Sequence, residues 1–429
     1  MKTAVIVGSG AGGATAAKEL QGYFDVTVLE AGKEFRPFAM NLKTAARLKK
    51  TRLISRVKDI EVIFPAMTIR ETDDGMVLVS GRGTGGTTTL STGNAMRMDH
   101  GLAKLGIRLD SEFEELASEV PITADHQRLW RPATQRLYQI CREMGLDPAP
   151  TPKMGAYERC AICGHCILGC DYGVKWDSRR FLEIALEKGA QIVTRARVER
   201  IAIENGRATG VEARIKGRRR FVRADVVILA AGGLGTPVIL QNSGIPCEPR
   251  LFVDPVLCLA GEWKGAFQNR EMPMPFVVQM DRYIISPYFD HLSFFFNKKW
   301  KYPAENILSL MIKLADSNAG SVTSTRLDKT LTAEDRRRLN QAMKLCTGIL
   351  QRAGIECFNI FTGTVNAGHP GGMLPLTAGD AESLHPEKLP ENVYLSDSTL
   401  FPESMGNPPI LTIMALAKRV AGVCRRTLA

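Results

Sequence analysis

The chain has 429 residues, 45% of them hydrophobic, and a formal net charge of +11. This composition excludes a disordered or fibrous protein and predicts a soluble globule of two domains. The ten cysteines are too few for a disulfide scaffold, and we find neither a cleavable leader pattern nor an apolar run of roughly 20 residues, so we expect reduced thiols, a cytoplasmic location and no transmembrane segment.

The first 30 residues predict a βαβ unit that binds a dinucleotide. Gly8, Gly10 and Gly13 form G-x-G-x-x-G between an apolar strand and an alanine-rich helix. Glycines at this place let the backbone turn tightly and approach a pyrophosphate at the helix N-terminus. Glu30 ends the next strand, where a carboxylate binds an adenosine ribose without a 2′-phosphate. A second such unit is missing, so one tightly held FAD is the simplest cofactor.

Next in the chain, a strand precedes a second glycine loop at 81–86, and residues 110–147 are predicted to be largely helical. Alternating strands then run from about 191, turn at Asn205-Gly206 and close into an apolar strand at 225–231. Aromatic segments such as "RYIISPYF" and "HLSFFFNKKW" predict further strands between 251 and 345. The tail from about 360 is predicted to form a strand and a last helix.

We therefore predict an α/β (overall α+β) protein with two domains. A Rossmann-like FAD-binding domain with a β-meander comprises 1–250 and 361–429 and carries a cysteine-loop insert at 156–176. A smaller substrate domain with an antiparallel sheet comprises 251–360.

The cysteine loop has the spacing C-x2-C-x2-C-x3-C, formed by Cys160, Cys163, Cys166 and Cys170. The first three cysteines match the spacing that binds a [4Fe-4S] cluster in bacterial ferredoxins. We predict such a cluster; plain thiols are the main alternative, and zinc fits less well because its sites usually pair two cysteines with a distant second pair. The fourth ligand is Cys170 or a distant cysteine, such as Cys141, Cys247 or Cys258.

Five segments in chain order resemble the glucose-methanol-choline family of FAD oxidoreductases: "GSGAGGATAA", "GRGTGGTTTLSTGNA", "ADVVILAAGGLGTPVIL", "NAGHPGG" and "YLSDSTLFPESMGNPPILTIMALAKR". A sixth, "CGHCILGCDYGVK", is similar to the cysteine segment of the long-chain alcohol oxidase branch of that family. Cys160 lies outside this shared pattern and completes the ferredoxin spacing. The resemblance does not cover residues 105–155 or most of 251–345.

The resemblance implies that an alcohol gives a hydride to flavin N5 while His369 takes the hydroxyl proton and Asn407 orients the substrate oxygen. A histidine in a tight turn also suits a general base on chemical grounds, since it titrates near neutrality. Other interpretations are a loop histidine, and an Asn407 side chain that caps the last helix.

The resemblance also implies further flavin contacts. Asp397 matches an aspartate near the FAD phosphates and ribityl chain, although a strand-end turn also suits it. Gly85, Gly86 and Asn94 match a second flavin-contacting loop, where glycines allow a close backbone approach.

The sequence thus predicts an FAD-dependent oxidoreductase of alcohols or sugar-like CH–OH groups (the EC 1.1 class), with electrons leaving through the cluster. The alternatives are the reverse reaction, in which a carrier drives carbonyl or enone reduction, and an electron-transfer subunit of a larger complex. An exposed cluster suits an anaerobe. Basic runs at 47–58, 216–223, 297–301 and 336–339 favour an acidic carrier such as a ferredoxin, and a quinone is the other acceptor. The sequence contains no nucleic-acid-binding pattern, and an oligomer is compatible with it.

Overall fold

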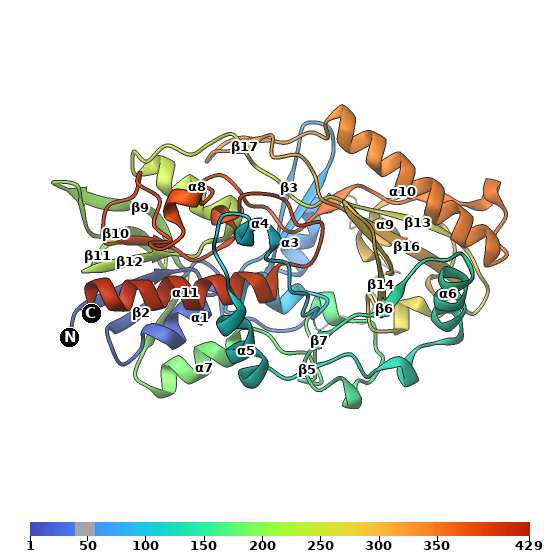
Figure 1. Cartoon of the computed structure of the whole chain (residues 1–429), viewed down its shortest axis with the longest axis horizontal. Coiled ribbons are helices and arrows are strands. Elements are labelled where there is room, and N and C mark those ends of the chain that lie inside the picture. The colour runs from blue at the N-terminus through green and yellow to red at the C-terminus, as the bar shows by residue number, and fades with distance from the viewer. Residues whose placement is uncertain (39–55) are drawn as a thin grey trace.

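The computed structural model describes residues 1–38 and 56–429, so most of the basic run at 47–58 lies outside the described residues. A parallel sheet and a large antiparallel sheet stand at opposite ends of the molecule (Figure 1). The two termini lie side by side at the parallel-sheet end, where Lys2 Nζ donates to the Leu428 carbonyl at 2.7 Å. Among the described residues, no helix is long and apolar enough to cross a membrane.

The parallel sheet forms as the βαβ pattern predicts. Its five strands run in the order β21-β12-β1-β2-β8, and every neighbouring pair is parallel. Helix α1 packs against the C-terminal helix α11 and against α7. The bounds are β1 Thr3–Val7, α1 Ala11–Leu20, β2 Asp25–Glu30, α7 Arg179–Glu187, β8 Gln191–Thr194, β12 Val226–Leu229, α8 Gly232–Asn242, β21 Val393–Leu395 and α11 Ile410–Leu428.

The predicted meander is a separate antiparallel sheet of β9, β10 and β11. Asn205 and Gly206 join its first two strands with φ values of 50° and 78°, which suit the left-handed turn of a tight hairpin. The bounds are β9 Ala196–Glu204, β10 Arg207–Ile215 and β11 Arg218–Arg223.

The large antiparallel sheet has nine strands, and α10 and α6 pack together at its end of the molecule (Figure 1). It takes strands from outside 251–360, namely β3, β4, β6, β19 and β20. Its bounds are β3 Met67–Glu71, β4 Val77–Gly81, β20 Asn366–Ala367, β13 Val256–Glu262, β16 Ile307–Leu314, β15 Tyr283–Pro287, β14 Phe276–Gln279, β6 Pro148–Pro150 and β19 Phe361–Thr362. The other helices are α3 Ile60–Ile63, α4 His100–Ala103, α5 Asp110–Glu119, α6 Pro132–Glu143, α9 His291–Phe296 and α10 Ala333–Arg352. Two short pairs are β5 Ile122–Thr123 with β7 Lys153–Met154, and β17 Ser321–Val322 with β18 Leu327–Asp328.

One predicted strand is wrong: "HLSFFF" forms helix α9. The Asp290 carboxylate accepts hydrogen bonds from the backbone N–H and the hydroxyl of Ser293. This N-cap starts a helical turn that the aromatic composition of the segment does not reveal.

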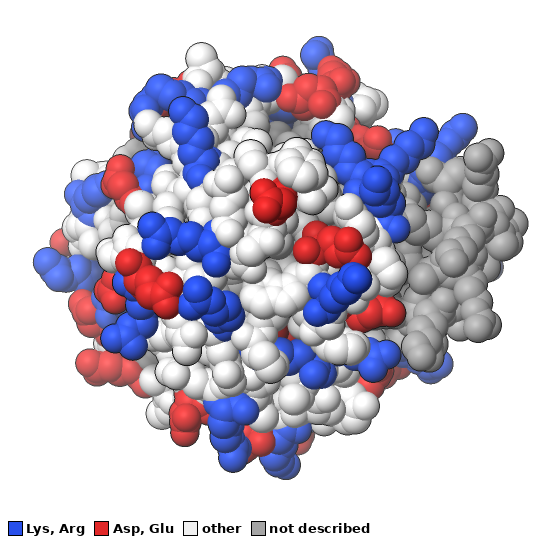
Figure 2. All heavy atoms as spheres, turned by 90° about the vertical axis from the view of Figure 1, so that its right-hand side faces the viewer, with Lys and Arg blue, Asp and Glu red and all other residues white. Residues whose placement is uncertain are grey.

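Basic and acidic side chains are interspersed over most of the described part of the face at the antiparallel-sheet end, and several Lys and Arg side chains gather at the upper right of the view (Figure 2). In the run at 336–339, Arg337 and Arg338 both contact Glu334.

A buried ion pair lies in the segment after β16 and binds the segment before β13 through a hydrogen bond. Lys329 Nζ lies 2.7 Å from Asp316 Oδ2, and both side chains are fully buried. The ammonium also donates to the carbonyls of Leu251, Ser317 and Ala319 at 2.8–2.9 Å. Its hydrogen bonds offset the loss of water, as burial of a charge requires.

We expect Lys329→Met to lower the free energy of unfolding by about 3–5 kcal/mol, because Asp316 would keep a buried charge without its partner. Chemical denaturation at equal flavin content measures this. Lys388→Met is the matched control: the Lys388–Glu248 pair is exposed, and losing it should cost no more than about 1 kcal/mol. Equal losses of unfolding free energy in Lys329→Met and Lys388→Met would contradict a special contribution of the buried pair to stability.

Candidate active site

Gly8, Gly10 and Gly13 each meet a different steric demand at the start of α1. Gly8 has a φ of 102°, and a Cβ there would lie 2.3 Å from the Ala230 carbonyl oxygen. A Cβ on Gly13 would lie 2.0 Å from the Gly8 oxygen, so Gly13 allows the helix to pack closely on the turn. A Cβ on Gly10 would meet only Gly86 Cα, at 3.9 Å, and would project beside the cavity that Gly10 lines.

Glu30 lies at the wall of this cavity, at the end of β2. Its carboxylate accepts four bonds, from the N–H and hydroxyl of Ser9 and from the N–H groups of Gly32 and Gly83. Burial raises the pKa of Glu30, while these donors favour its ionised form. The acid therefore also fixes the glycine turn against the second glycine loop.

The second glycine loop leads into the 3-10 helix η2 (Gly86–Leu90). Gly85 and Gly86 have φ values of 91° and 52°, and a Cβ on Gly86 would lie 2.8 Å from Gly10 Cα. The two glycine turns thus meet backbone to backbone. Gly86 and Asn94 line the cavity.

Asp397 follows β21 and also lines the cavity. One oxygen accepts from the Gly232 N–H at 2.9 Å and from the Thr236 hydroxyl at 2.5 Å, and the other accepts from the Thr399 N–H at 2.9 Å. Asp397 is therefore both the turn residue after a strand and the anchor of the first turn of α8 at the cavity wall. Burial raises its pKa.

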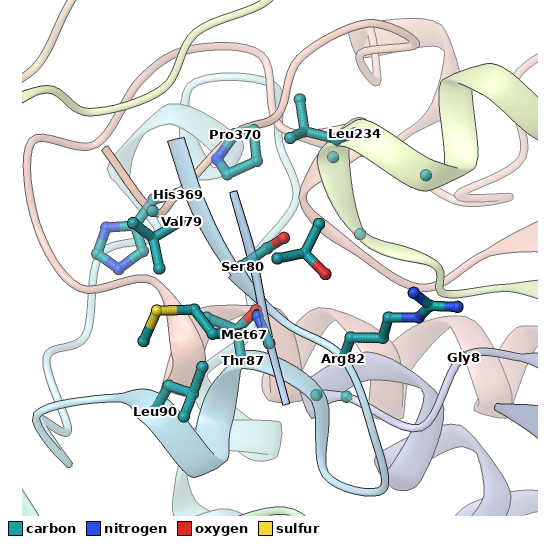
Figure 3. Close-up of a pocket in the computed structure, with 18 of the residues that line it drawn as sticks. Gly8, Met67, Val79, Ser80, Arg82, Thr87, Leu90, Leu234, His369 and Pro370 are labelled. Carbon is teal, nitrogen blue, oxygen red and sulfur yellow. The ribbon is translucent and has the colours of Figure 1, made fainter. Parts of the chain in front are cut away.

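These residues surround one cavity of about 1340 Å³, which runs from the glycine turns to the antiparallel sheet. It is larger than the ~300–1,000 Å³ of an ordinary small-ligand site, so it has room for a dinucleotide and a substrate. Figure 3 shows His369 beside Val79 and Met67, on the opposite side of the view from Gly8 and Arg82. Met67, Val79 and Leu90 lie on the same side of this view as His369, and other apolar or aromatic residues that line the cavity are Met274, Tyr288, Phe295, Phe296 and Met311.

His369 is held by two residues that the sequence analysis missed. Lys313 Nζ lies 2.5 Å from His369 Nδ1 and 3.2 Å from Asp254 Oδ2. Burial and the nearby Lys313 lower the pKa of His369 to about 4. The sequence held a signal for Lys313, which is the one cation in the otherwise apolar or small strand "ILSLMIKL". His291, also missed, lines the cavity and has a buried Nε2 with no partner among the described residues.

Asn407 does not cap the last helix. Helix α11 begins at Ile410, with Pro409 at the N-cap position and no capping side chain. Asn407 Nδ2 donates to Gln279 Oε1 at 3.2 Å and to the Met405 carbonyl at 3.3 Å. Its Oδ1 is buried and has no partner among the described residues, whereas Pro408 and Pro409 border the cavity. The amide therefore lies just behind the cavity wall.

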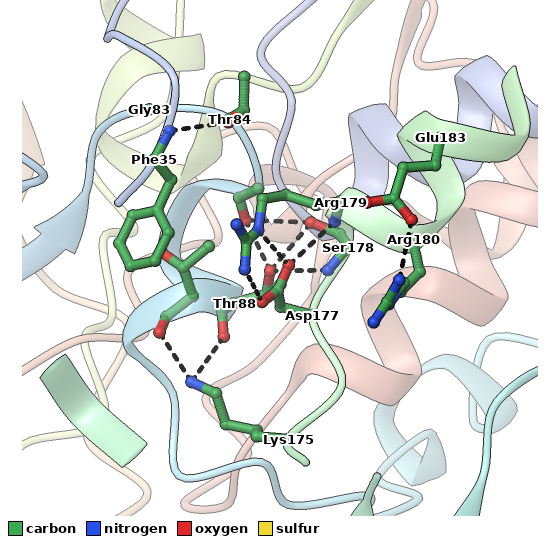
Figure 4. Close-up of polar contacts among 12 residues, drawn as sticks. Phe35, Gly83, Thr84, Thr88, Lys175, Asp177, Ser178, Arg179, Arg180 and Glu183 are labelled. Atoms are coloured by element: carbon green, nitrogen blue, oxygen red, sulfur yellow. Dashed lines mark hydrogen bonds and ion pairs between the residues drawn. The ribbon is translucent and has the colours of Figure 1, made fainter. Parts of the chain in front are cut away.

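The cysteine loop lies against the second glycine loop. Cys166 begins the 3-10 helix η5 (Cys166–Leu168), and Ile167 and Leu168 line the cavity. Buried Lys175 joins the two loops, and Figure 4 shows its bonds to the second glycine loop. Its Nζ donates to the carbonyls of Thr89 at 2.7 Å, Cys166 at 2.8 Å, Ser91 at 3.0 Å and Thr88 at 3.3 Å.

A second buried ammonium, that of Lys153, lies behind the same loop. Lys153 Nζ donates to Asn94 Oδ1 at 2.5 Å and to the carbonyls of Thr92 and Pro273. Burial lowers its pKa to about 7, and the nearby Cys166 and Cys160 oppose this effect. Burial raises the pKa of Cys166, which the two lysines oppose.

The loop cysteines lie close enough to interact electrostatically: after burial, Cys163, Cys166 and Cys170 raise the pKa of Cys160, Cys166 and Cys170 raise that of Cys163, and Cys170 raises that of Cys166. Cys141, in contrast, neighbours Cys346, and Cys247 lies against Pro237. Among the described residues, no three His, Cys, Asp or Glu side chains converge as ligands of a single metal ion.

Comparison with known proteins identifies the family. The family model described as GMC oxidoreductase matches residues 3–256, more than half of the chain. The chain belongs to the GMC oxidoreductase family. This confirms the resemblance, the FAD-binding α/β fold and the oxidoreductase class; FAD is the cofactor expected of a GMC oxidoreductase, and the cavity and its glycine turns fit it.

Several relatives of this GMC oxidoreductase align over most of its length. An uncharacterized protein of Methanocaldococcus jannaschii is 27% identical over 427 residues, covering 96% of this chain and 97% of that protein. An uncharacterized GMC-type oxidoreductase of Mycobacterium tuberculosis is 29% identical over 490 residues, covering 97% of this chain and 75% of that protein. Long-chain-alcohol oxidase FAO1 of Arabidopsis thaliana is 22% identical over 513 residues, covering 96% of this chain and 65% of that protein.

Pyridoxine 4-oxidase from Mesorbium loti shares the fold, with a TM-score of 0.73 at 18% identity, covering 98% of this chain and 99% of that one.

We expect Gly10→Ala to weaken FAD binding at least about tenfold, because the added methyl group would occupy the space that the pyrophosphate approaches. The flavin-to-protein ratio after dialysis, together with titration of the apoprotein, measures the effect. The unfolding free energy of the apoprotein should change by less than about 1 kcal/mol, since no protein atom is close to the new Cβ. Gly348→Ala in α10, which has similar free space, is the control and should retain FAD; equal flavin retention in both variants would contradict this role.

Proposed function

We propose that this GMC oxidoreductase interconverts an apolar alcohol and its carbonyl compound, with His369 moving the hydroxyl proton. The carrying observation is that His369 lies on an apolar wall of the same cavity that the dinucleotide-type glycine turns border. FAD, when bound, supplies a two-electron acceptor for the hydride of the substrate carbon. The low pKa of His369 keeps its ring neutral at pH 7, as proton acceptance requires.

The other predicted residues have roles consistent with this function. Gly8, Gly10, Gly86 and Glu30 would hold the dinucleotide end of FAD, and Asp397 with α8 would border its middle. Asn407 Oδ1 has no partner among the described residues, but the amide lies behind the cavity wall formed by Pro408 and Pro409, so its expected role in orienting the substrate oxygen remains a proposal. Long-chain-alcohol oxidases among the relatives and the apolar wall favour an aliphatic substrate over a sugar.

We also propose that electrons leave through a [4Fe-4S] cluster bound by Cys160, Cys163, Cys166 and Cys170. In a cluster each thiolate binds a different iron atom, so the ligands need not converge on one ion. Two buried ammonium groups face these thiols, and neither forms an ion pair with a carboxylate among the described residues. A cluster with four thiolates is anionic and would offset these charges.

A cluster at this place would adjoin the cavity through Ile167 and Leu168. Reduced flavin holds two electrons, while a [4Fe-4S] cluster takes one at a time, so the acceptor would be a one-electron carrier, either acidic and ferredoxin-like or a quinone. The ten free cysteines support a reducing compartment such as the cytoplasm, and the cluster supports anaerobic metabolism.

We expect His369→Asn to slow anaerobic flavin reduction by about 10²–10⁴-fold, the usual effect of removing a general base, while FAD stays bound. Bleaching of oxidised flavin measures the rate with a panel of 1-octanol, benzyl alcohol, pyridoxine and glucose. His100→Asn, an exposed histidine, is the control. Unchanged reduction in His369→Asn would exclude His369 as the base, and no bleaching by any alcohol while a carbonyl reoxidises the reduced flavin would favour the reverse reaction.

Protein purified without oxygen should contain about four iron and four sulfide ions per chain, with an EPR signal after dithionite reduction. Cys163→Ser should lose the signal, whereas Cys357→Ser, an exposed cysteine elsewhere, should keep it. If the protein remains yellow but free of iron after anaerobic reconstitution, the cysteine loop binds no cluster and has only a structural role.

A further inference from the structure

A chain of charged and polar groups continues behind His369, away from the cavity. Lys313 is the last residue but one of the buried strand β16, and its side chain is only 2% exposed. Asp254, in the segment before β13, is 1% exposed and lies 3.2 Å from the ammonium. His369 is 25% exposed and borders the cavity. The three groups thus lead from the cavity into the protein interior.

The surroundings of Asp254 stabilise its ionised form. Its Oδ1 accepts from the Ser404 hydroxyl and from the Gly406 N–H. Burial alone would raise its pKa, but Lys313, His369 and Ser404 outweigh burial and lower it to about 2. A permanent buried anion stabilises the protonated form of Lys313 next to it.

The contacts of Lys313 differ from those of Lys329, the other buried lysine nearby. Lys329 donates to a carboxylate and three carbonyls, which satisfies it. Lys313 has one carboxylate, one carbonyl at 3.3 Å and His369 Nδ1. Its remaining bond therefore goes to a group that can itself accept a proton.

This bond determines which ring nitrogen of His369 carries hydrogen. A protonated lysine only donates, so Nδ1 must accept and a neutral ring must carry its hydrogen on Nε2. Nε2 has no hydrogen-bond partner among the described residues, and the ring borders the cavity. In this state the site gives a proton to the cavity and cannot take one.

We propose that Lys313 is the proton carrier behind His369, so that protons move between the substrate oxygen and the Lys313 amine through the two nitrogens of the ring. The inference rests on the proposed alcohol–carbonyl chemistry. In carbonyl reduction, His369 Nε2 gives its proton to the substrate oxygen as the carbon gains the hydride, and Nδ1 takes a proton from the Lys313 ammonium. In alcohol oxidation, the O–H bond breaks toward Nε2, the carbon loses its hydride to the flavin, and the Nδ1 proton passes to a neutral Lys313 amine.

The relay makes the two directions depend oppositely on pH. Alcohol oxidation needs the neutral amine, so its rate should rise as pH rises through the pKa of Lys313, while carbonyl reduction should fall. Burial lowers this pKa from its ordinary value, and Asp254 and Asp316 oppose that effect. The other charged groups here are His369 and Lys329, which pairs with Asp316; the strand neighbours of Lys313, Val256 and Ile284, are apolar.

The first experiment measures the tautomer and the pKa of the His369 ring directly and needs no substrate. In protein with ¹⁵N-labelled histidine, with the signal assigned by His369→Gln, we expect the Nε2–H tautomer at pH 7. Lys313→Met should raise the pKa of His369 from about 4 toward about 6.5. Lys313→Arg keeps the charge and should keep the low pKa. An Nδ1–H tautomer, or a His369 pKa unchanged in Lys313→Met, would overturn the proposal even if alcohols reduce the flavin.

The second experiment separates a proton carrier from a fixed charge. Arginine stays protonated, so Lys313→Arg should slow flavin reduction by 1-octanol by about 10²-fold or more and abolish its rise with pH, while FAD content and unfolding stay unchanged. Wild-type rates in Lys313→Arg would overturn the relay and leave Lys313 as a counterion. If no alcohol reduces the wild-type flavin, the proposed function fails, whereas the tautomer measurement still decides whether Lys313 donates to His369.

Discussion

Burial of lysine ammonium groups is the constraint on which the walls of the cavity depend. Among the described residues around it, Lys153, Lys175, Lys313 and Lys329 are almost completely buried. A buried cation is costly unless several acceptors replace its water. Those acceptors come from segments far apart in the chain, so each lysine fixes one segment against another. Lys175 joins the cysteine loop to the second glycine loop, and Lys329 joins the segments before β13 and after β16.

The four lysines differ in the groups that accept their hydrogen bonds. This difference distinguishes the lysines that stabilise the fold from the one proposed to take part in the reaction. Lys329 donates to three carbonyl oxygens and to the Asp316 carboxylate, so its contacts hold segments of the chain together. Lys153 and Lys175 rely on carbonyl and amide oxygens and face thiols, which fit an anionic group at the loop. Lys313 alone among the four donates to an imidazole. A stabilising network therefore becomes a path for protons at this one point.

Features that depend on neighbours in the chain were predictable from the sequence. The glycine turn at Gly8 and Gly10 and the acid Glu30 lie within one βαβ unit, and His369 stood out within a recognisable segment. The contacts of His369 were not predictable, because Asp254, Lys313 and His369 are brought together only by the antiparallel sheet. Phe295 and Phe296 were expected on a strand, but the Asp290 cap starts a helix that turns them toward the cavity. Asn407 suited a helix cap by its type, yet the helix begins three residues later.

The position of the two proposed exits gives the cavity a consistent chemistry. Oxidation of an alcohol releases a proton from the oxygen and, from the carbon, a hydride that carries two electrons and a second proton, so the oxygen's proton and the hydride's electrons must leave by different routes. The proposed proton route would begin at His369 and run to Lys313, in strand β16, and to Asp254, just before β13. The proposed electron route would begin beside the second glycine loop and lead to the cysteines past Ile167 and Leu168, which line the cavity. Because fixed charges line both routes, a negative carboxylate behind the proton carrier and positive ammonium groups beside the cluster, each would attract the particle that it conducts.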